Sequence, residues 1–371
     1  MVAAAVALLL AGVTVAILTL TGGKSTTVKV AADAPAVGPY VIHGDELLDG
    51  DGRPFFLHGV DRPSLEWSCA GQAIGGGTGI PASDFSAIRA WGANTVRISL
   101  NQDYWLSALG VPVAPGAHCP GYIDTVKAAV HEAEADHLVV VLDLHSSDPG
   151  NPQLKGGPQP MPDQGSVRFW RSVAHTFGGD WNVMFELFNE PRDVSWTVWQ
   201  DGGQVKSGPH TYRAVGMQQL VDAVRGTGAH NVILADGVNF AATLAGVPSH
   251  LLTGGGIGYA IHPYAGTDTT SPSVWQRRFG FLTSTHLVVA TEFGDQRPGV
   301  TGYDSNILDF FRSHAMGWTA WAWWDGNYKF PSLIDGRGAC VDAGCPDRDA
   351  LLAFARGRSR MVVPRAVISE R

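Results

Sequence analysis

Short apolar segments recur along this chain, and most of them are followed by a stretch in which apolar residues take helical spacing. A continuous apolar run is typical of a strand buried on both faces, whereas apolar residues at positions i, i+3, i+4 and i+7 indicate a helix. Strands are predicted over residues 55–60, 94–99, 138–145, 183–190, 232–235, 258–264, 287–293 and 318–324. Helices are predicted over residues 84–91, 122–137, 165–177, 212–225, 274–283, 305–314 and 349–356, with 243–252 as a short candidate.

Strands and helices thus alternate over about 310 residues, which predicts an α/β protein with a (β/α)8 TIM barrel. An open, doubly wound sheet is the alternative. It is disfavoured because no Gly-x-Gly-x-x-Gly turn follows the first strand, and because polar residues stand at many strand ends rather than at one crevice. We therefore expect a single barrel domain over residues 39–356.

The beginning of the chain does not follow this pattern. Residues 2–20 form an almost unbroken apolar run, long enough to cross a bilayer once or to be the core of a signal peptide. No basic residue precedes the run, which suggests that the natural start lies upstream, and residues 30–32 offer a small-residue cleavage site. We predict that residues 1–38 are a signal peptide or membrane anchor plus a linker. The domain would then be secreted or anchored on the outer face of the cell membrane.

The other end of the chain and the overall charge narrow the partners. After residue 357 the sequence turns basic and loses its periodicity, so residues 357–371 are predicted to be a solvated basic tail. The whole chain carries 26 basic and 34 acidic side chains, a formal net charge of -8. Because nucleic-acid binding needs clustered Lys and Arg, we expect no nucleic-acid partner. We expect a monomer.

The chain has four cysteines, which in an exported protein favour two disulfides. Cys340 and Cys345 are close enough in sequence to pair locally. That leaves Cys69 with Cys119, which the predicted strands place in neighbouring loops. A zinc site is the competing interpretation, but no Cys-x-x-Cys or paired-His spacing supports it.

Polar and aromatic residues stand at the carboxyl ends of the predicted strands, where the functional face of a barrel lies. They are Arg97, His145, Asn189, Glu190, His262, Tyr264, Glu292, Trp323 and Trp324. Glu190 and Glu292 end the fourth and seventh strands, on opposite sides of the barrel mouth. Two carboxylates that face each other across a cleft are what cleavage of a glycosidic bond needs. Glu186 and Asp143 lie deeper in their strands, and we interpret them as structural acids.

The segments around these residues resemble a known family. Residues 185–191, which include Asn189-Glu190-Pro191, resemble the Asn-Glu-Pro signature of glycoside hydrolase family 5, the clan A retaining enzymes that include the cellulases. Residues 290–294 resemble its nucleophile strand. Residues 94–99, 143–145, 261–264 and 321–324 resemble its second, third, sixth and eighth strands, and the match keeps its order from about residue 58 to residue 325.

The resemblance implies roles for individual residues. Glu190 would be the acid/base and Glu292 the nucleophile. Asn189 would hydrogen-bond the 2-hydroxyl of the sugar. Arg97 would keep Glu292 ionised, because a nearby cation lowers a carboxylate pKa, and Tyr264 would donate a hydrogen bond to Glu292.

Three further residues would line the subsite at the cleaved bond. His145 and His262 would serve as hydrogen-bonding groups. Trp323 would be the floor on which the sugar ring stacks, since strand register with Trp321 favours it over Trp324. The resemblance implies neither a metal nor a cofactor.

We therefore expect a retaining, endo-acting β-glycanase that cleaves a β-linked polysaccharide, most simply a β-1,4-glucan. Mannanase, xyloglucanase, β-1,3-glucanase and glycosphingolipid-cleaving activities are the alternatives within the family. A carbohydrate-binding barrel without activity is a third kind of function, disfavoured because both acids are present. A metal-dependent barrel hydrolase is disfavoured because the first strand ends Leu57-His58-Gly59-Val60, without His-x-His.

Overall fold

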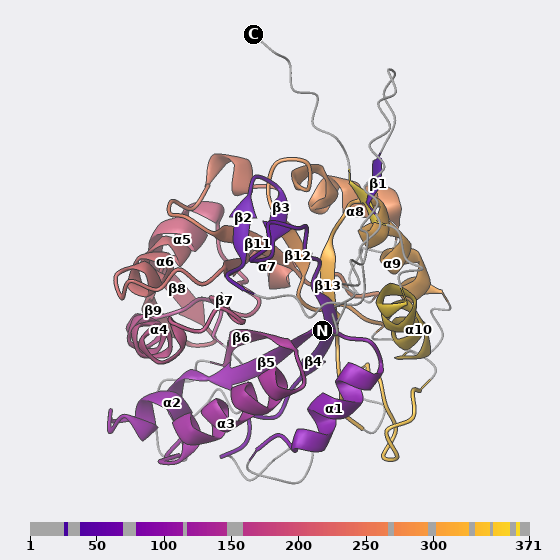
Figure 1. The fold of residues 1–371 in the computed structure, drawn as a ribbon. Helices are drawn as coiled ribbons and strands as arrows, with labels where there is room; N and C mark the ends of the chain where they lie inside the picture. Colours follow the sequence, from indigo (N-terminus) through magenta and orange to yellow (C-terminus); the bar gives the residue numbers. More distant parts are fainter. Residues whose placement is uncertain are drawn as a thin grey trace, which may run out of the picture.

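A computed structural model describes residues 26–28, 38–69, 79–113, 117–146, 159–265, 271–295, 302–325, 331–341, 344–356 and 361–363. Eight parallel strands close into a barrel, as predicted, and the helices are arranged around them (Figure 1). In barrel order the strands are β4 (His58–Arg62), β5 (Thr95–Asn101), β6 (Val139–Ser146), β7 (Val183–Glu186), β10 (Ile233–Asp236), β11 (Ile257–Ile261), β12 (Val288–Ala290) and β13 (Gly317–Ala320). The pairing of β13 with β4 closes the ring.

The helices follow the predicted order. Those predicted from periodicity are α1 (Ala82–Ala90), α3 (Tyr122–Ala135), α4 (Gln164–Phe177), α6 (Met217–Arg225), α8 (Pro272–Arg278), α9 (Tyr303–Ser313) and α10 (Gly344–Ala355). Three short helices were not predicted: α2 (Gln102–Ala108), α5 (Trp196–Asp201) and α7 (Val238–Ala241). The helix expected over residues 243–252 is only a 3-10 turn, η1 (Val247–Ser249), and a second one, η2 (Gly280–Leu282), follows α8.

The predicted helix over residues 212–225 is wrong in its first part. Residues His210–Val215 form β9, which pairs with β8 (Gly202–Ser207) in an antiparallel hairpin, and α6 begins only at Met217. Val205 and Ala214 are buried on one side of this hairpin against Met161. In β9 the alternation of apolar and polar residues that indicates a strand is short. The helical spacing of apolar residues in α6 follows it directly, so the two segments were predicted as one helix.

A second hairpin covers the amino-terminal end of the barrel. It consists of β2 (Val41–His43) and β3 (Glu46–Leu48). Leu47 packs in one cluster with Leu57 and Met184, at the amino-terminal end of the barrel strands. The hairpin therefore seals the end opposite the strand termini that carry the predicted site.

Both ends of the chain contribute to a further small sheet. We predicted residues 26–28 to be linker and residues 361–363 to be solvated tail, but β1 (Thr26–Val28) and β14 (Met361–Val363) pair antiparallel. Both predictions were wrong because these strands form through pairing with each other. Three residues are too few to show the periodicity from which a strand is predicted. The predicted signal or anchor run, residues 2–20, lies outside the described residues. Among the described helices, none is long and apolar enough to span a membrane.

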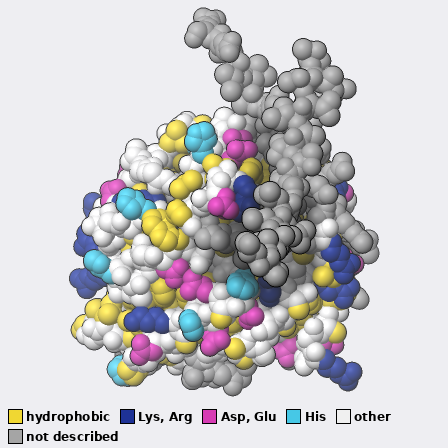
Figure 2. Space-filling model, viewed as in Figure 1, with side chains coloured by type: hydrophobic (Ala, Val, Ile, Leu, Met, Phe, Trp, Pro, Cys, Tyr) yellow, Lys and Arg dark blue, Asp and Glu magenta, His cyan; other side chains and the backbone are white. Residues whose placement is uncertain are grey.

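The cysteines pair as predicted. Cys69 is bonded to Cys119, with Cα atoms 5.9 Å apart, and Cys340 is bonded to Cys345, with Cα atoms 5.2 Å apart. The first bond joins the segment after β4 to the segment before α3, across 50 residues of sequence. Figure 2 shows basic side chains at several separate places on the described part of one face.

Candidate active site

Alternation along the strands decides which side chains enter the barrel. In β5, Val96 and Ile98 pack in the core between the strands and the helices, so that Arg97 points into the barrel. The same parity turns Phe185 of β7 outward and Glu186 inward. The charged and titratable side chains buried inside the barrel by this alternation are Asp61, Arg97, Asp143, Glu186, Asp236 and His262.

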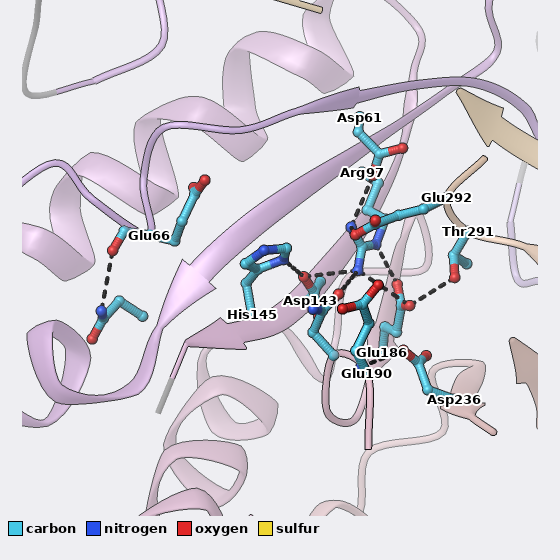
Figure 3. Close-up of polar contacts among 12 residues, drawn as sticks. Asp61, Glu66, Arg97, Asp143, His145, Glu186, Glu190, Asp236, Thr291 and Glu292 are labelled. Atoms are coloured by element: carbon cyan, nitrogen blue, oxygen red, sulfur yellow. Dashed lines mark hydrogen bonds and ion pairs between the residues drawn. The ribbon is translucent and has the colours of Figure 1, made fainter. Parts of the chain in front are cut away.

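Arg97 is the centre of this buried group (Figure 3). Its Nε lies 2.6 Å from Glu186, and its Nη1 lies 2.9 Å from Asp61 and 2.7 Å from Glu292. Its Nη2 lies 2.9 Å from Asp143. Burial alone would lower the pKa of Arg97, but the carboxylates raise it well above its usual range. Glu186 and Asp143 are therefore paired structural acids, as predicted.

Glu292 lies two residues beyond the end of β12 and is 4% exposed. Its Oε1 accepts a hydrogen bond from Arg97, and its Oε2 accepts one from the Tyr264 hydroxyl, each at 2.7 Å. Burial raises the pKa of Glu292, but the charges of His262 and Arg97 outweigh this and hold the pKa below its usual range. Glu292 is thus an ionised carboxylate with both oxygens held, which suits a nucleophile.

Glu190 lies beyond the regular part of its strand. We predicted a strand up to residue 190, but β7 ends at Glu186, although the N–H of Asn189 still donates to the carbonyl of Leu144. Extension stops because Glu190 takes a left-handed conformation, with φ 55°, and because Pro191 has no N–H to donate. The side chain of Glu190 is 23% exposed, so it is open to solvent while Glu186 is not.

His262 brings the two candidate acids together. Its Nδ1 lies 3.2 Å from Glu190 Oε1 and 3.6 Å from Glu292 Oε2. The Nδ1 of His262 and one carboxylate oxygen of each glutamate lie within 4.8 Å of one another. Carboxyl groups ~5 Å apart are typical of retaining glycosidases, whereas inverting enzymes keep them ~6.5–9.5 Å apart. The ring of His262 is fully buried, and its Nε2 is held by Thr291 Oγ1 at 3.1 Å.

Asn189 and His145 occupy the positions expected of them at the barrel mouth. The Oδ1 of Asn189 accepts a hydrogen bond from Arg97 at 2.8 Å, which leaves its amide N–H groups as donors. The Nδ1 of His145 lies 2.8 Å from Asp143 Oδ2. Burial alone would lower the pKa of His145, but the hydrogen bond to Asp143 and its charge raise the pKa to about 9.

The structure contradicts the prediction that Trp323 is the stacking floor. Trp323 is 3% exposed and packs edge-on against Trp91, with ring centroids 4.7 Å apart. β13 ends at Ala320, so the parity that we counted from Trp321 does not extend to Trp323. Trp321 is instead the half-buried indole of this segment, and it stacks on His145 with centroids 5.6 Å apart.

Sequence reasoning missed two residues beside Glu190. Asp236 is fully buried and accepts a hydrogen bond from the backbone N–H of Glu190 at 2.9 Å. Asp236 directly follows the predicted strand 232–235. The other candidate site residues were also recognised at the carboxyl ends of strands, so this position was the signal that could have identified it. Phe240 is 45% exposed, and the guanidinium of Arg192 lies 5.4 Å from its ring centre. An isolated Phe in a loop gives no such signal in the sequence.

Two sets of three side chains among the described residues have atoms close enough to hold a cation. They are Glu186 with Asp236 and His262, and Glu190 with His262 and Glu292. Burial lowers the pKa of His262, but the charge of Glu292 and the hydrogen bonds to Glu186 and Glu190 outweigh it and raise the pKa well above its usual range. A protonated imidazole has no lone pair for a metal, so His262 is not suited to be a ligand in either set.

Comparison with known proteins agrees with this geometry. A family model described as cellulase, glycosyl hydrolase family 5, matches residues 48–327. An endoglucanase of Microbulbifer sp. is 25% identical over 303 residues, which cover 79% of this chain and 53% of that protein. A manganese-dependent endoglucanase of Phanerodontia chrysosporium is 28% identical over 194 residues, which cover 51% of this chain and 45% of that protein. The chain thus spans about half the length of these relatives.

Solved structures share the barrel. A β-glucanase of Saccharophagus degradans, crystallised in complex with cellotetraose, superposes with a TM-score of 0.66 at 19% identity. The alignment covers 86% of this chain and 95% of that one. At this level of identity the likeness establishes the fold. The roles of individual site residues therefore depend on the geometry described above.

Proposed function

Because this chain belongs to the cellulase family, glycosyl hydrolase family 5, we propose that it hydrolyses the backbone of a β-1,4-glucan with retention of anomeric configuration. One observation carries the proposal. A carboxylate oxygen of Glu190 and one of Glu292 lie within 4.8 Å of each other, close enough for the second acid to attack the sugar directly. An inverting enzyme would need a wider gap to hold a water molecule between acid and sugar.

The surroundings of the two glutamates support different roles. Glu292 is ionised, and both its oxygens are held, so it is suited to attack the anomeric carbon. Glu190 is more exposed, and its Oε1 lies 3.2 Å from His262 Nδ1, so its carboxyl group can exchange a proton with the leaving oxygen. Asn189, whose carbonyl oxygen is bound by Arg97, would offer its N–H groups to the sugar 2-hydroxyl.

The reaction then has two displacements. In the first, Glu292 forms an ester bond to the anomeric carbon while Glu190 gives its proton to the departing glycosidic oxygen. In the second, Glu190 takes a proton from a water molecule, whose oxygen replaces Glu292 on the anomeric carbon. The product keeps the β configuration, and both carboxyl groups return to their starting states. Neither displacement uses a metal or a cofactor.

The choice of β-1,4-glucan is supported by resemblance alone. The relatives above are named endoglucanases, and the Saccharophagus structure holds cellotetraose. Mannan, xyloglucan, β-1,3-glucan and glycosphingolipids are the alternatives, because the six matched segments are common to the family. Trp321, half-buried beside His145, is the indole that we propose to stack against the sugar.

An extracellular site of action completes the proposal. Both cysteine pairs form disulfides, and such bonds persist in oxidising compartments. The apolar run over residues 2–20 is the segment that would direct export. Whether that run is cleaved or retained as an anchor is decided by the mass of the mature protein isolated from its native cells.

The mechanism is tested with Glu190→Ala and Glu292→Ala on a substrate with an activated aryl leaving group. We expect E190A to lose about 10²–10⁴-fold in kcat/KM on polysaccharide but much less in kcat/KM on the aryl substrate, whose leaving group needs no protonation to depart. We expect E292A to lose activity on both. Added azide should yield a β-glycosyl azide with E190A and an α-glycosyl azide with E292A. The reverse pattern, or an inverted product from the wild type, would refute the assignment.

The substrate is tested by comparing initial rates on carboxymethyl cellulose, mixed-linkage glucan, mannan, xyloglucan, laminarin and glucosylceramide. We expect the two β-1,4-linked glucans to give the highest kcat/KM, with a rapid fall in viscosity as the mark of endo action. Mannan as the best substrate would overturn the glucanase proposal and leave the two glutamates in their roles. No reaction on any substrate would favour the carbohydrate-binding alternative.

A further inference from the structure

Asp236, the last residue of β10, links two parts of the site that are far apart in sequence. Its Oδ2 accepts a hydrogen bond from the backbone N–H of Glu190, 46 residues earlier, at 2.9 Å. Its own backbone is held by the indole of Trp199, which donates to the Asp236 carbonyl at 2.8 Å. Asp236 is fully buried, so it cannot reach a polysaccharide in the cleft.

The residue that Asp236 holds has a conformation that needs support. Glu190 has φ 55°, in the left-handed region, where the Cβ of a residue other than glycine comes too close to its own backbone. A second contact holds the chain just after Glu190, since the N–H of Phe240, in the segment after β10, donates to the carbonyl of Pro191 at 3.0 Å. Asp236 and the segment that follows it therefore hold the backbone at the acid/base and at the residue after it.

We infer that Asp236 is a positioning residue, whose carboxyl group, in its neutral form, holds the Glu190 peptide so that the Glu190 side chain points toward Glu292. The inference rests on the proposed function only for its effect on rate. The structural part of the inference is supported by the hydrogen bond from the Glu190 N–H, by the burial of Asp236 and by the charges around it.

The groups that face Asp236 explain the neutral form. From β7 comes Glu186, whose carboxyl group lies close to that of Asp236 (Figure 3). From the segment after β11 comes His262, with its Nε2 3.6 Å from Asp236 Oδ2, and from β5 comes Arg97. Arg97 already pairs with four other carboxylates: Asp61, Asp143, Glu186 and Glu292.

Two neighbouring carboxylates in a buried site do not both ionise readily. Burial, followed by the charge of Glu186, raises the pKa of Asp236 well above its usual range. No hydrogen-bond donor reaches the Oδ1 of Asp236 within the described part of the chain, so a negative charge on this buried oxygen would be uncompensated. A neutral Asp236 can donate to the neighbouring Glu186 carboxylate while its Oδ2 still accepts from the Glu190 N–H.

Two variants separate this role from a merely structural one. Asp236→Asn keeps an oxygen for the Glu190 N–H and replaces the acid O–H with an amide N–H, so we expect it to keep kcat within about threefold of wild type. Asp236→Ala removes both contacts, and we expect kcat on polysaccharide to fall about 10²-fold with little change in KM. On the activated aryl substrate, whose leaving group needs no proton, the loss in kcat/KM for D236A should be much smaller.

Asp304 offers a matched control. It is also buried, 6% exposed, and burial followed by the charge of Asp295 raises its pKa to about 7, but it lies on α9, outside the site. Asp304→Ala should lower the melting temperature without changing kcat or its dependence on the leaving group. If D236A behaved like D304A, Asp236 would have no positioning role.

A readout independent of activity keeps the inference testable if the proposed function fails. In protein labelled with 15N-glutamate, the Glu190 amide should be protected from hydrogen exchange in wild type and D236N but not in D236A. In protein labelled with 13C-aspartate, one carboxyl signal should keep the position of a neutral acid at about pH 6, where an ordinary aspartate is ionised, and vanish in D236N. An exposed Glu190 amide in wild type, or equal rate losses for D236N and D236A, would overturn the inference.

Discussion

The Nη1 of Arg97 lies 2.7 Å from the Oε1 of Glu292, and both side chains are buried. A guanidinium at this distance stabilises the ionised form of a carboxyl group that burial would otherwise favour as the neutral acid. The same guanidinium is shared with Asp61, Asp143 and Glu186, so the charge of Glu292 is one part of a larger balance. Replacing Arg97 should therefore affect both chemistry and stability.

The charges of His262 and Arg97 lower the pKa of Glu292, so we predict that Arg97→Met raises this pKa by removing the second of them. Since Glu292 must be ionised to attack, the acidic limb of the kcat/KM profile should move to higher pH. The variant should also lose about 3–5 kcal/mol in the free energy of unfolding, as expected when one partner of a buried ion pair is removed. Arg97→Lys, which keeps the charge, is the control and should shift the limb less. An unmoved limb in R97M would contradict the role of Arg97.

The two tryptophans after β13 should respond in opposite ways. Trp321→Ala should lower kcat/KM by about tenfold or more, equivalent to ~1.4 kcal/mol, through the loss of a stacking face, with a small change in stability. Trp323→Ala should cost about 3–5 kcal/mol of unfolding free energy, because its ring fills the core against Trp91. Urea denaturation and kinetics on one glucan measure both. A binding defect in W323A alone would restore the original assignment of the floor.

Some features of the fold and of the site could be predicted from the sequence and others could not, for physical reasons. The barrel could be predicted because strands buried on both faces are continuous apolar runs, and this signal survives without knowledge of contacts. Arg97 and Glu186 could be placed because strand parity holds inside a regular ladder. Parity fails where a ladder ends, and that is why Trp323, three residues past the end of β13, was assigned to the wrong side.

Asp236 and the β8–β9 hairpin illustrate what periodicity cannot show. The hydrogen bond from Glu190 to Asp236 depends on a single left-handed residue, which no pattern of apolar positions encodes. The hairpin buries only Val205 and Ala214 against Met161, a pattern too sparse to compete with the helix that follows. Such features depend on tertiary contacts, so they become visible only when the fold is known.

A chelator should leave the rate unchanged. Two His-carboxylate sets lie close enough to hold a cation, but the raised pKa of His262 keeps its ring protonated and unable to donate a lone pair. We expect the same kcat before and after dialysis against EDTA, and no increase on adding Mn²⁺, unlike a relative named as manganese dependent. Loss of activity on chelation, restored by one metal, would replace the metal-free mechanism.

His145 should give the protein a pH-dependent stability. The hydrogen bond and charge of Asp143 raise the folded-state pKa of His145 from 6.5 to about 9 despite its burial. A raised histidine pKa stabilises the fold fully below the unfolded-state value and loses this contribution as pH rises through the folded-state value. The contribution of His145 should therefore be present at about pH 6, decline between about pH 6.5 and 9, and amount to about 3 kcal/mol at most.

This decline is measured as a difference between variants, because other groups titrate in the same range. We expect the gap in unfolding free energy between wild type and His145→Gln to narrow as the pH rises from about 6.5 to 9, as read from urea denaturation at each pH. His131→Gln, on the exposed face of α3, is the matched control and should show no such change. A gap that stays constant, or widens, with pH would mean that His145 is not held in its charged form by Asp143.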